Sequence, residues 1–347
     1  MAQKRILLIG ERSLSYEGYA YADSFYDILT GQGHVVKSID PAQTPWWMRG
    51  ERSFLLSGLE QKLFSLWFNR MVIEVAHDFK PDVCFVIKGH VLHPQTLAEL
   101  KENLDLKLVL LYPDNPFMFS NGNSNAHVVR GLPLYDVVLS WAQMMQPVFT
   151  SLGVAHTCYF PFGYDERFFT YSCSENQAFD LGFVGTADDE RAVLLENVIR
   201  KAPDITLGIW GNRWSEYFSS KPLLKKCYQG EARYKHAMVC MMQQSKITLN
   251  PVRLQNHTAH NMRSLEAAAA GVFQLATRTH EHAHVLFEEG VSIALYASVD
   301  ELVEKVYWYR DRAEERNNIA QHAQKAVLRY RLQQMLPVFF NNNCCFC

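Results

Sequence analysis

Several patterns that would identify a function are missing from this chain of 347 residues. No GxGxxG follows the first apolar run, which ends at Gly10, so the sequence argues against a nicotinamide dinucleotide site. No Asp-x-Asp lies between apolar residues, so a carboxylate pair that could hold a divalent ion on a diphosphate is absent. We therefore expect neither a bound cofactor nor a metal ion.

Charge and apolar runs exclude further classes. The formal net charge is -2, so no overall basic balance suggests a nucleic-acid partner. No apolar run reaches the roughly 20 residues that cross a bilayer. The first residues, Met1 to Lys4, do not lead into a signal peptide. We expect a cytoplasmic protein without a transmembrane segment.

The eight cysteines show no zinc spacing. Reduced, buried thiols are expected at the five scattered ones, which are Cys84, Cys158, Cys173, Cys227 and Cys240. The other three lie close together in the tail, where acylation, metal capture and a sequence artefact all stay open.

Length and composition favour two folded domains, since 48% of the residues are hydrophobic and 20% are charged. Short apolar runs at 5–10 and 34–40 flank a helical pattern and predict a β-α-β opening. Further strands are predicted at 80–90, 106–111, 135–140, 156–163, 179–186, 205–210, 245–250 and 272–276. The expected domains are 1–168 and 178–330, followed by a tail at 331–347.

A long helical pattern at 59–79 follows the aromatic and basic segment 45–49. An amphipathic segment on a membrane surface is one interpretation, and it leaves open a peripheral position at the inner membrane surface. A helix that packs on the sheet is the favoured interpretation. Its predicted core face consists of Leu63, Leu66, Trp67, Met71 and Val75.

The most informative stretch runs from Leu249 to Gly290 and alternates strand, polar loop, small-residue helix, strand and polar loop. A carboxylate such as Glu266 can accept hydrogen bonds from both hydroxyls of a ribose. The amino terminus of the helix suits a diphosphate, and the small residues up to Gly271 allow close packing. A tightly packed core helix with a solvated Glu266 is the competing interpretation.

The motif Asn261-x-Arg263-x-x-Glu266-Ala267-x-Ala269-x-Gly271 resembles the nucleotide-sugar motif of GT-B glycosyltransferases. The CgeB-like branch of the retaining group-1 superfamily is the most similar. Strand ends at Lys88-Gly89 and Asp114-x-Pro116, and the turn Gly211-x-x-Trp214, extend the resemblance over most of the chain. Many members carry another glutamate eight residues before Glu266, where this chain has Thr258.

The resemblance implies an α/β fold of two Rossmann-like domains that face each other across a cleft. It implies donor binding by the second domain and acceptor binding by the first. The implied reaction moves a sugar from a nucleotide diphosphate sugar, UDP-sugar as the expected donor, to an acceptor hydroxyl, with retention and without a metal ion. A non-catalytic nucleotide-sugar or glycan-binding module and a nucleotide-sugar epimerase are the alternatives. The acceptor stays open between glycan, protein and small molecule.

Site residues follow from the same resemblance. The reaction is assigned to Arg191, Lys88, Asp114 and His90. Donor contacts are assigned to Gly185, Thr186, Arg191, Gly211, Asn212, Trp214, Asn250, Asn261, Arg263, Glu266 and His282. Further candidates near phosphate or acceptor are Arg12, Ser13 and Lys246.

Structural roles compete with several of these assignments. Lys88 and Arg191 also suit exposed surface charges, His90 a helix cap, and Asp114 a turn. Trp214 suits either stacking on a base or core packing. His280, His282 and His284 would share one face of a strand, where a sugar or phosphate contact ranks above a solvated loop and a metal site.

Overall fold

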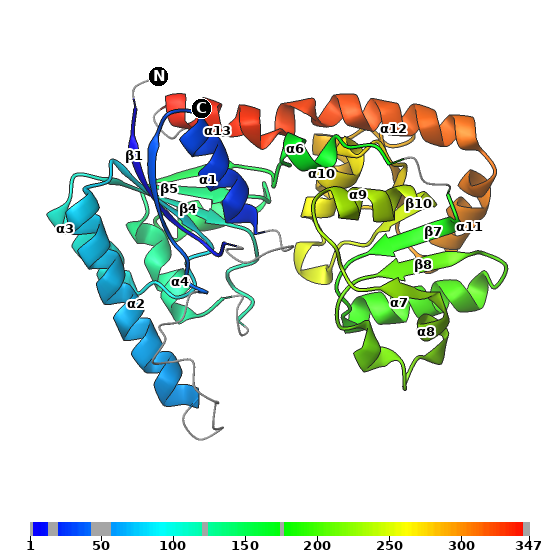
Figure 1. The fold of residues 1–347 in the computed structure, drawn as a ribbon, viewed down its shortest axis with the longest axis horizontal. Helices are drawn as coiled ribbons and strands as arrows, with labels where there is room; N and C mark the ends of the chain where they lie inside the picture. The colour runs from blue at the N-terminus through cyan, green and yellow to red at the C-terminus, as the bar shows by residue number, and fades with distance from the viewer. Residues whose placement is uncertain (1–2, 13–19, 43–56, 120–123, 174–176, 343–347) are drawn as a thin grey trace. The chain divides into compact units, whose positions relative to one another are not determined.

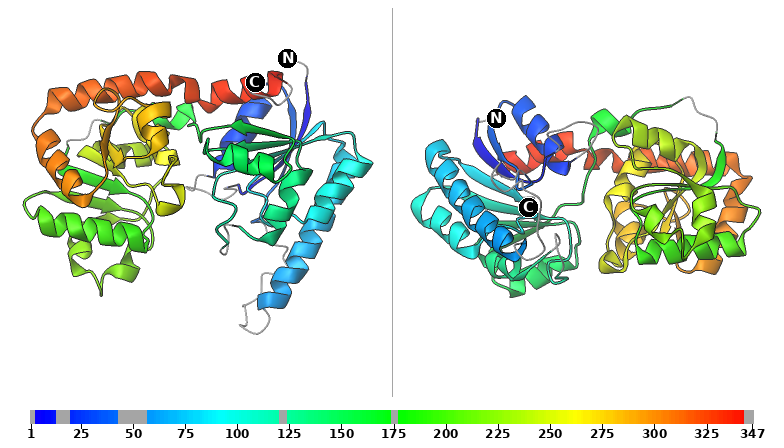
Figure 2. Two further views of the ribbon diagram at one scale, coloured as in Figure 1. Left: turned by 180° about the vertical axis from the view of Figure 1, so that it is seen from behind. Right: turned by 60° about the horizontal axis from the view of Figure 1, so that its bottom comes forward.

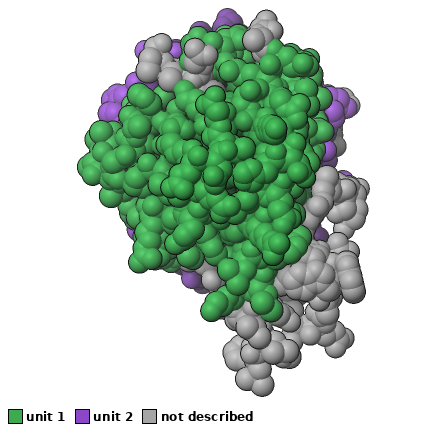
Figure 3. All heavy atoms as spheres, turned by 90° about the vertical axis from the view of Figure 1, so that its left-hand side faces the viewer, with its two compact units in different colours: residues 1–161, 333–347 green, residues 162–332 purple. Residues whose placement is uncertain are grey.

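The computed structural model describes residues 3–12, 20–42, 57–119, 124–173 and 177–342. It divides into two compact units, which are coloured separately in Figure 3. The first consists of Met1–Pro161 and Gln333–Cys347, and the second of Phe162–Leu332. No helix among the described residues is long and apolar enough to cross a membrane.

The first unit is built on a six-stranded parallel sheet in the order β2-β1-β3-β4-β5-β6 (Figure 1). Its strands are β1 Arg5–Ile9, β2 Val35–Ile39, β3 Val83–Ile87, β4 Lys107–Tyr112, β5 Val137–Ser140 and β6 His156–Tyr159. Its helices are α1 Tyr21–Gly31, α2 Ser57–Phe79, α3 Pro94–Asn103, α4 Ala126–Gly131, α5 Met145–Ser151 and α13 Leu332–Asn341. The apolar runs become strands because both faces of such a sheet are covered, as Figures 1 and 2 show.

The second unit repeats this plan, with the strand order β12-β11-β10-β7-β8-β9, all parallel. Its strands are β7 Phe179–Val184, β8 Leu207–Trp210, β9 Tyr228–Gly230, β10 Ser245–Asn250, β11 Gln274–Thr277 and β12 Ala294–Tyr296. Its helices are α6 Glu166–Phe169, α7 Asp189–Lys201, α8 Pro222–Cys227, α9 His236–Gln243, α10 Met262–Ala269, α11 Val299–Arg310 and α12 Ala313–Val327. The predicted doubly wound α/β plan is therefore confirmed for both units.

Strand order reverses once in each sheet. In the first unit the chain builds β1 and β2 and then crosses to β3 on the other side of β1. In the second unit it builds β7, β8 and β9 and then crosses to β10 on the other side of β7. Each reversal leaves a crevice at the carboxyl ends of the two flanking strands.

The predicted core face of α2 is wrong by about one residue. Leu63 and Leu66 are 47% and 52% exposed, whereas Phe68, Val72 and Ala76 are fully buried. These three residues recur at intervals of four, so they form one stripe along the helix. Both sets fit the same periodicity, and packing against the rest of the unit selects the second. The segment 45–49 lies outside the described residues.

The expectation of reduced thiols is wrong for Cys173 and Cys240, which form a disulfide across 67 residues. Gln243 on α9 explains how the two come together. Its Oε1 accepts a hydrogen bond from the Cys173 backbone N–H at 2.8 Å, and its Nε2 donates to the Tyr171 carbonyl. The segment Tyr171–Cys173 is thereby held beside α9, where Cys240 lies.

Helix α13 belongs to the core of the first unit, although its sequence lies in the segment 331–347. Phe339 is fully buried and Phe340 is 2% exposed. The rings of both pack on Phe85 of β3, with centroids 6.1 and 6.0 Å away. The described chain beyond them, Asn341 and Asn342, is exposed.

Removal of one of these rings tests the contribution of α13. We expect Phe340→Ala to lower the free energy of unfolding of the first unit by about 3–5 kcal/mol, because it leaves a cavity beside Phe85. Val338→Ala on the same helix is the control, since Val338 is 42% exposed. A chain that stops after Asn342 should unfold like the full chain. Chemical denaturation measures all three, and equal losses for the two alanine variants would refute the packing role.

Candidate functional site

The reversal in the second unit lies between β7 and β10, and ligands of doubly wound sheets bind beyond the carboxyl ends of such strands. Strand β7 continues into the loop 185–188 and then into α7. Strand β10 continues into Pro251, Val252 and Arg253. Both exits therefore meet at the same edge of the sheet.

Three arginines surround the end of β7. Arg191 of α7 donates from Nη1 to the Thr186 carbonyl at 2.8 Å and lies 3.4 Å from Asp188 Oδ2. Arg253 contacts the same Asp188 oxygen through Nε at 2.7 Å. Arg263 of α10 reaches back to the Val184 carbonyl, the last residue of β7, at 3.5 Å. Arg191 is about sixty to seventy residues from the other two in the sequence, and Arg253 and Arg263 come from the loop after β10 and from the helix that follows it.

Two of these guanidinium groups carry a buried donor without a partner. The Nε atoms of Arg191 and Arg263 are inaccessible to solvent and form no hydrogen bond within the described chain. Burial, and after it the charge of the neighbouring Arg253, lower the pKa of Arg191 to about 10. An unpaired buried N–H is unfavourable, so a rotation of either side chain toward an anionic ligand with oxygen acceptors would be favoured.

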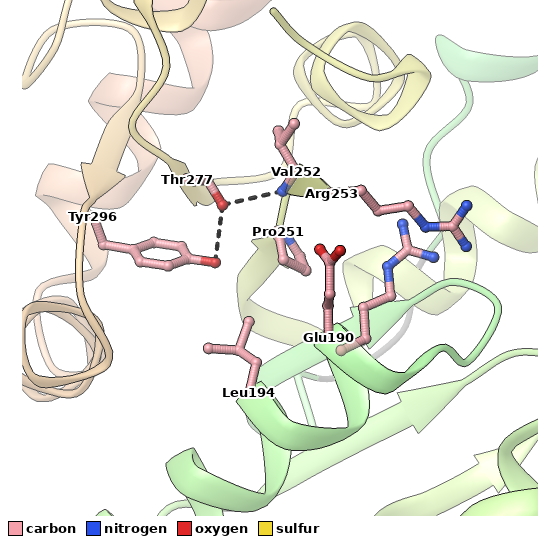
Figure 4. A pocket seen from close by; sticks show the side chains of 8 residues that line it. Glu190, Leu194, Pro251, Val252, Arg253, Thr277 and Tyr296 are labelled. Atoms are coloured by element: carbon pink, nitrogen blue, oxygen red, sulfur yellow. Dashed lines mark hydrogen bonds between the residues drawn. The ribbon is translucent and has the colours of Figure 1, made fainter. Parts of the chain in front are cut away.

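A pocket of about 140 Å³ opens beside the arginines (Figure 4). Its lining comprises Glu190, Arg191, Leu194, Pro251, Val252, Arg253, Thr277 and Tyr296. The Thr277 hydroxyl orders the far wall, because it accepts from the Val252 N–H at 3.0 Å and donates to the Tyr296 oxygen at 3.2 Å. The result is a small recess that combines apolar walls with a cationic rim.

Arg253 and Asp188 were not among the residues predicted from the sequence. The available signal was positional, because Arg253 follows the carboxyl end of β10 by three residues and Asp188 follows that of β7 by four. In a parallel sheet both places lie at the ligand-binding edge.

Two glycine turns shape the loops after β7 and β8. Gly211 has φ +149°, and a Cβ there would lie 1.9 Å from the carbonyl oxygen of Gly185, so the turn accepts only glycine. The Asn212 carbonyl accepts from the Ala187 N–H at 2.9 Å, which joins the two loops. Gly185, Thr186, Gly211 and Asn212 therefore lie together.

Trp214 packs in the core rather than facing a ligand. It is 1% exposed, belongs to the hydrophobic core of the second unit and donates from Nε1 to the Gly185 carbonyl at 3.0 Å. Of its two predicted roles, the structure shows core packing. The indole also holds the glycine loop in place.

A buried polar network holds the start of α10. The Asn261 side chain caps the helix by accepting from the Ser264 N–H, and its Nδ2 donates to Asn250 Oδ1 at 2.9 Å. His282 donates from Nδ1 to the Thr277 carbonyl at 2.8 Å, and its Nε2 accepts from the Ser264 hydroxyl at 2.7 Å. Asn250, Asn261 and His282 thus position the helix that carries Arg263 and Glu266.

Glu266 is 4% exposed and forms an ion pair with Arg263, whose Nη1 lies 2.8 Å from Oε2. Burial raises the pKa of this carboxyl, and Arg263 counteracts the rise. Its Oε1 accepts no hydrogen bond from the described residues. One carboxylate oxygen is therefore available, while the other is shared with an arginine of the cluster.

The three alternating histidines do not share a face, because the segment is helical. Residues His282–Leu286 form a π-helix. His280 and His284 are exposed and pack against each other with ring centroids 5.1 Å apart, while His282 is fully buried. Helical geometry brings positions 280 and 284 together, whereas the expectation of one face assumed a strand.

Lys246 lies at the opposite edge of the sheet, so its predicted place near a diphosphate is wrong. It is the second residue of β10 and forms an ion pair with Asp180 at the start of β7, at 2.8 Å. The strand rises about 3.3 Å per residue, which separates Lys246 from Asn250 by about 13 Å.

In the first unit, three residues that were assigned to the reaction, Lys88, His90 and Asp114, follow the ends of β3 and β4. Lys88 Nζ lies 3.1 Å from Asp114 Oδ2, and both side chains are about one quarter exposed. Burial lowers the pKa of His90, and Lys88 lowers it further. Arg12 is held by Asp23 at 3.0 Å and by the Ser38 hydroxyl. Ser13 lies outside the described residues.

The role of His282 in the network predicts a pH dependence. Burial lowers its pKa to about 4 from 6.5, so between these values the unfolded chain binds a proton that the folded chain does not. Wild type should therefore lose more free energy of unfolding than His282→Gln as the pH falls through this window. The loss of free energy of unfolding in wild type should exceed that in the variant by at most roughly 3 kcal/mol. Denaturant titrations at several pH values measure it, with His284→Gln as the exposed control. Parallel profiles for wild type and His282→Gln would contradict the assignment.

The chain is similar to known proteins in part of its sequence and in its fold. Residues 191–336 match a family model described as glycosyl transferase-like. No curated protein matches the chain.

Solved structures match both units over nearly the whole chain. HepE from Anabaena, crystallised in complex with UDP and glucose, is 16% identical, with a TM-score of 0.65 over 98% of this chain and 100% of that one. Sucrose-phosphate synthase from Thermosynechococcus elongatus is 11% identical, with a TM-score of 0.73 over 98% and 99%. The lipopolysaccharide outer core galactosyltransferase WaaB is 12% identical, with a TM-score of 0.64 over 97% and 98%. The chain therefore has the GT-B fold of glycosyltransferases, and most of its second unit is glycosyl transferase-like in sequence.

Proposed function

We propose that this protein transfers a sugar from a nucleotide diphosphate sugar to an acceptor hydroxyl and that its second unit binds the donor. The observation that carries the proposal is the cluster of Arg191, Arg253 and Arg263 at the reversal between β7 and β10. Two of its buried Nε donors lack a partner among the described residues. A diphosphate supplies both the acceptor oxygens and the negative charge that such donors need.

The donor ribose is assigned to Glu266. Its free Oε1 is available to one hydroxyl, and Oε2 becomes available when Arg263 turns toward the phosphates. The ion pair at 2.8 Å therefore links the two halves of the donor site. Gly185, Thr186, Gly211 and Asn212 form the loops that the donor would approach.

The chemistry requires little beyond charge stabilisation. The bond between the anomeric carbon and the diphosphate oxygen breaks while a bond to the acceptor oxygen forms. The leaving diphosphate takes the acceptor proton, and Arg191 and Arg263 stabilise its charge. This front-face route proceeds with retention and needs neither a strong protein base nor a metal ion.

Acceptor contacts are assigned to Lys88, His90 and Asp114 of the first unit. The lowered pKa of His90 favours a neutral imidazole at pH 7, which can accept a hydrogen bond from a hydroxyl. The Asp114 carboxylate offers a second hydrogen-bond acceptor for that hydroxyl, and the ion pair with Lys88 fixes the position of the carboxylate. The chemical class of the molecule that receives the sugar is open.

Further details are part of the same proposal. UDP is the proposed nucleotide, since HepE, of the same fold, was crystallised with UDP and glucose. The motif from Asn261 to Gly271 supports a place in the CgeB-like branch. We also propose that the protein is cytoplasmic, either free or attached to the inner membrane surface.

Arg191→Gln tests the diphosphate site. Loss of a charge-assisted hydrogen bond corresponds to about 1.5–3 kcal/mol, so UDP affinity should fall roughly tenfold to a hundredfold. Arg200→Gln is the matched control on α7, because Arg200 pairs with Glu196 alone among the described residues and its side chain is 61% exposed. Calorimetric titration in excess chelator measures both. Equal affinity in the two variants, or binding that requires added Mg²⁺ or Mn²⁺, would rule out the proposed site.

Glu266→Gln tests the ribose assignment. The substitution retains shape but weakens acceptance from the ribose, so kcat/KM should fall by about 2–3 kcal/mol, on the order of a hundredfold. A 2′-deoxyribose donor separates this from a structural effect. Wild type should discriminate strongly against it and the variant much less. If both proteins discriminate equally, Glu266 does not hold the ribose.

A further inference from the structure

A second pocket lies at the opposite edge of the sheet in the second unit, among the amino-terminal ends of its strands. Its volume is about 220 Å³, larger than the recess beside the arginine cluster. It is lined by Ser172, Cys173, Gln177, Gln243, Ser245, Lys246, Gly271, Val272, Phe273, Arg316, Asn317 and Ala320. Ser245 and Lys246 begin β10, whose other end carries Asn250, so the two sites are separated by the length of the strand.

Arg316 is the most unusual side chain of this pocket. It is only 5% exposed, yet no carboxylate of the described residues forms an ion pair with it. Its Nη1 donates to the carbonyls of Tyr309 and Arg310, which end α11. Its Nε and Nη2 donate to no described residue. The outer edge of the guanidinium group, which can hold two oxygens at once, is left for another partner.

Lys246 provides a second cation in the same pocket. Its Nζ contacts Asp180 Oδ1 at 2.8 Å, and its side chain remains 31% exposed. Asp180 is already shared, because its Oδ2 accepts from the Thr206 hydroxyl at 2.9 Å. An ammonium group has three donors, so Lys246 retains capacity for an anion.

Part of the remaining lining is polar and suits the same kind of ligand. Gln177, Gln243 and Asn317 supply amide groups. Arg316 could serve only to hold the carboxyl end of α11, and this role accounts for the two hydrogen bonds of Nη1. It does not account for the unpaired Nε and Nη2 atoms or for the presence of Lys246 in the same pocket.

We propose that this pocket binds a small anion that carries a phosphate or carboxylate group. The Nε and Nη2 edge of Arg316 receives two oxygens, and Lys246 supplies a point charge. The volume corresponds to roughly seven waters at about 30 Å³ each, which suits a small phosphorylated or carboxylated metabolite. The site is independent of the donor site, which lies at the other edge of the sheet.

Inorganic phosphate is the probe, titrated calorimetrically into the full chain at constant ionic strength. We expect saturable binding that Lys246→Gln weakens about tenfold, equivalent to about 1.4 kcal/mol. Lys221→Gln is the matched control, because Lys221 forms a similar 2.8 Å ion pair with Glu196 and is 22% exposed. Arg316→Lys, which keeps the charge but loses the two-oxygen edge, should also weaken binding.

Arg253→Gln shows which of the two pockets binds the phosphate, since Arg253 lines the pocket beside the arginine cluster and not this one. We expect this variant to retain the phosphate affinity that Lys246→Gln loses. The proposal is overturned if wild type shows no saturable binding, if Lys246→Gln binds like wild type, or if only Arg253→Gln loses binding. Because nucleotide is absent throughout, failure here leaves the proposed donor site untouched, and failure of nucleotide binding leaves this pocket untouched.

Discussion

The parallel order of the second sheet is the constraint on which the candidate site depends. Every strand of that sheet ends at the same edge, so each loop that follows a strand is brought to one place. The reversal between β7 and β10 then opens this edge between two neighbouring strands. Arg191 is distant in the sequence from Arg253 and Arg263, and they meet because the segments after β7 and β10 leave the sheet at this point.

Electrostatics gives the meeting point its chemistry. Three guanidinium groups gather around Asp188 and the end of β7, and two retain a buried N–H without an acceptor in the described chain. Such donors are unfavourable where they lie and become favourable if the side chains rotate toward phosphate oxygens. Because Arg263 also pairs with Glu266, the phosphate and ribose parts of a donor would be sensed together. The same sheet carries cations at its other edge, where Arg316 and Lys246 lack a full set of partners.

The sequence predicted the elements that form apolar runs but not the short ones. Strands β1, β4 and β10 were visible because both faces of a parallel sheet are buried. Strands β9 and β12, three residues each, carry no pattern long enough to read. The face of α2 was missed because two adjacent stripes had the same period. Distance in the sequence concealed the disulfide between Cys173 and Cys240.

Individual site residues were harder to predict because tertiary contacts decide their roles. Trp214 had a side chain suited to both stacking and packing, and only its burial shows which one occurs. The alternation of His280, His282 and His284 implied one face only if the segment were a strand. Arg253 stood next to a recognised motif without belonging to it. In contrast, the role of Gly211 could be predicted, since a glycine after a strand often allows two backbone segments to approach closely.

The account rests on recognition of a diphosphate by the arginine cluster. Titration of the full chain with UDP and with uridine, in chelator and at two salt concentrations, tests this most directly. The account predicts that UDP binds at least about a hundredfold more tightly than uridine, corresponding to two charge-assisted hydrogen bonds, and that added salt weakens UDP alone. Equal affinities for UDP and uridine, or no binding of UDP, would contradict it.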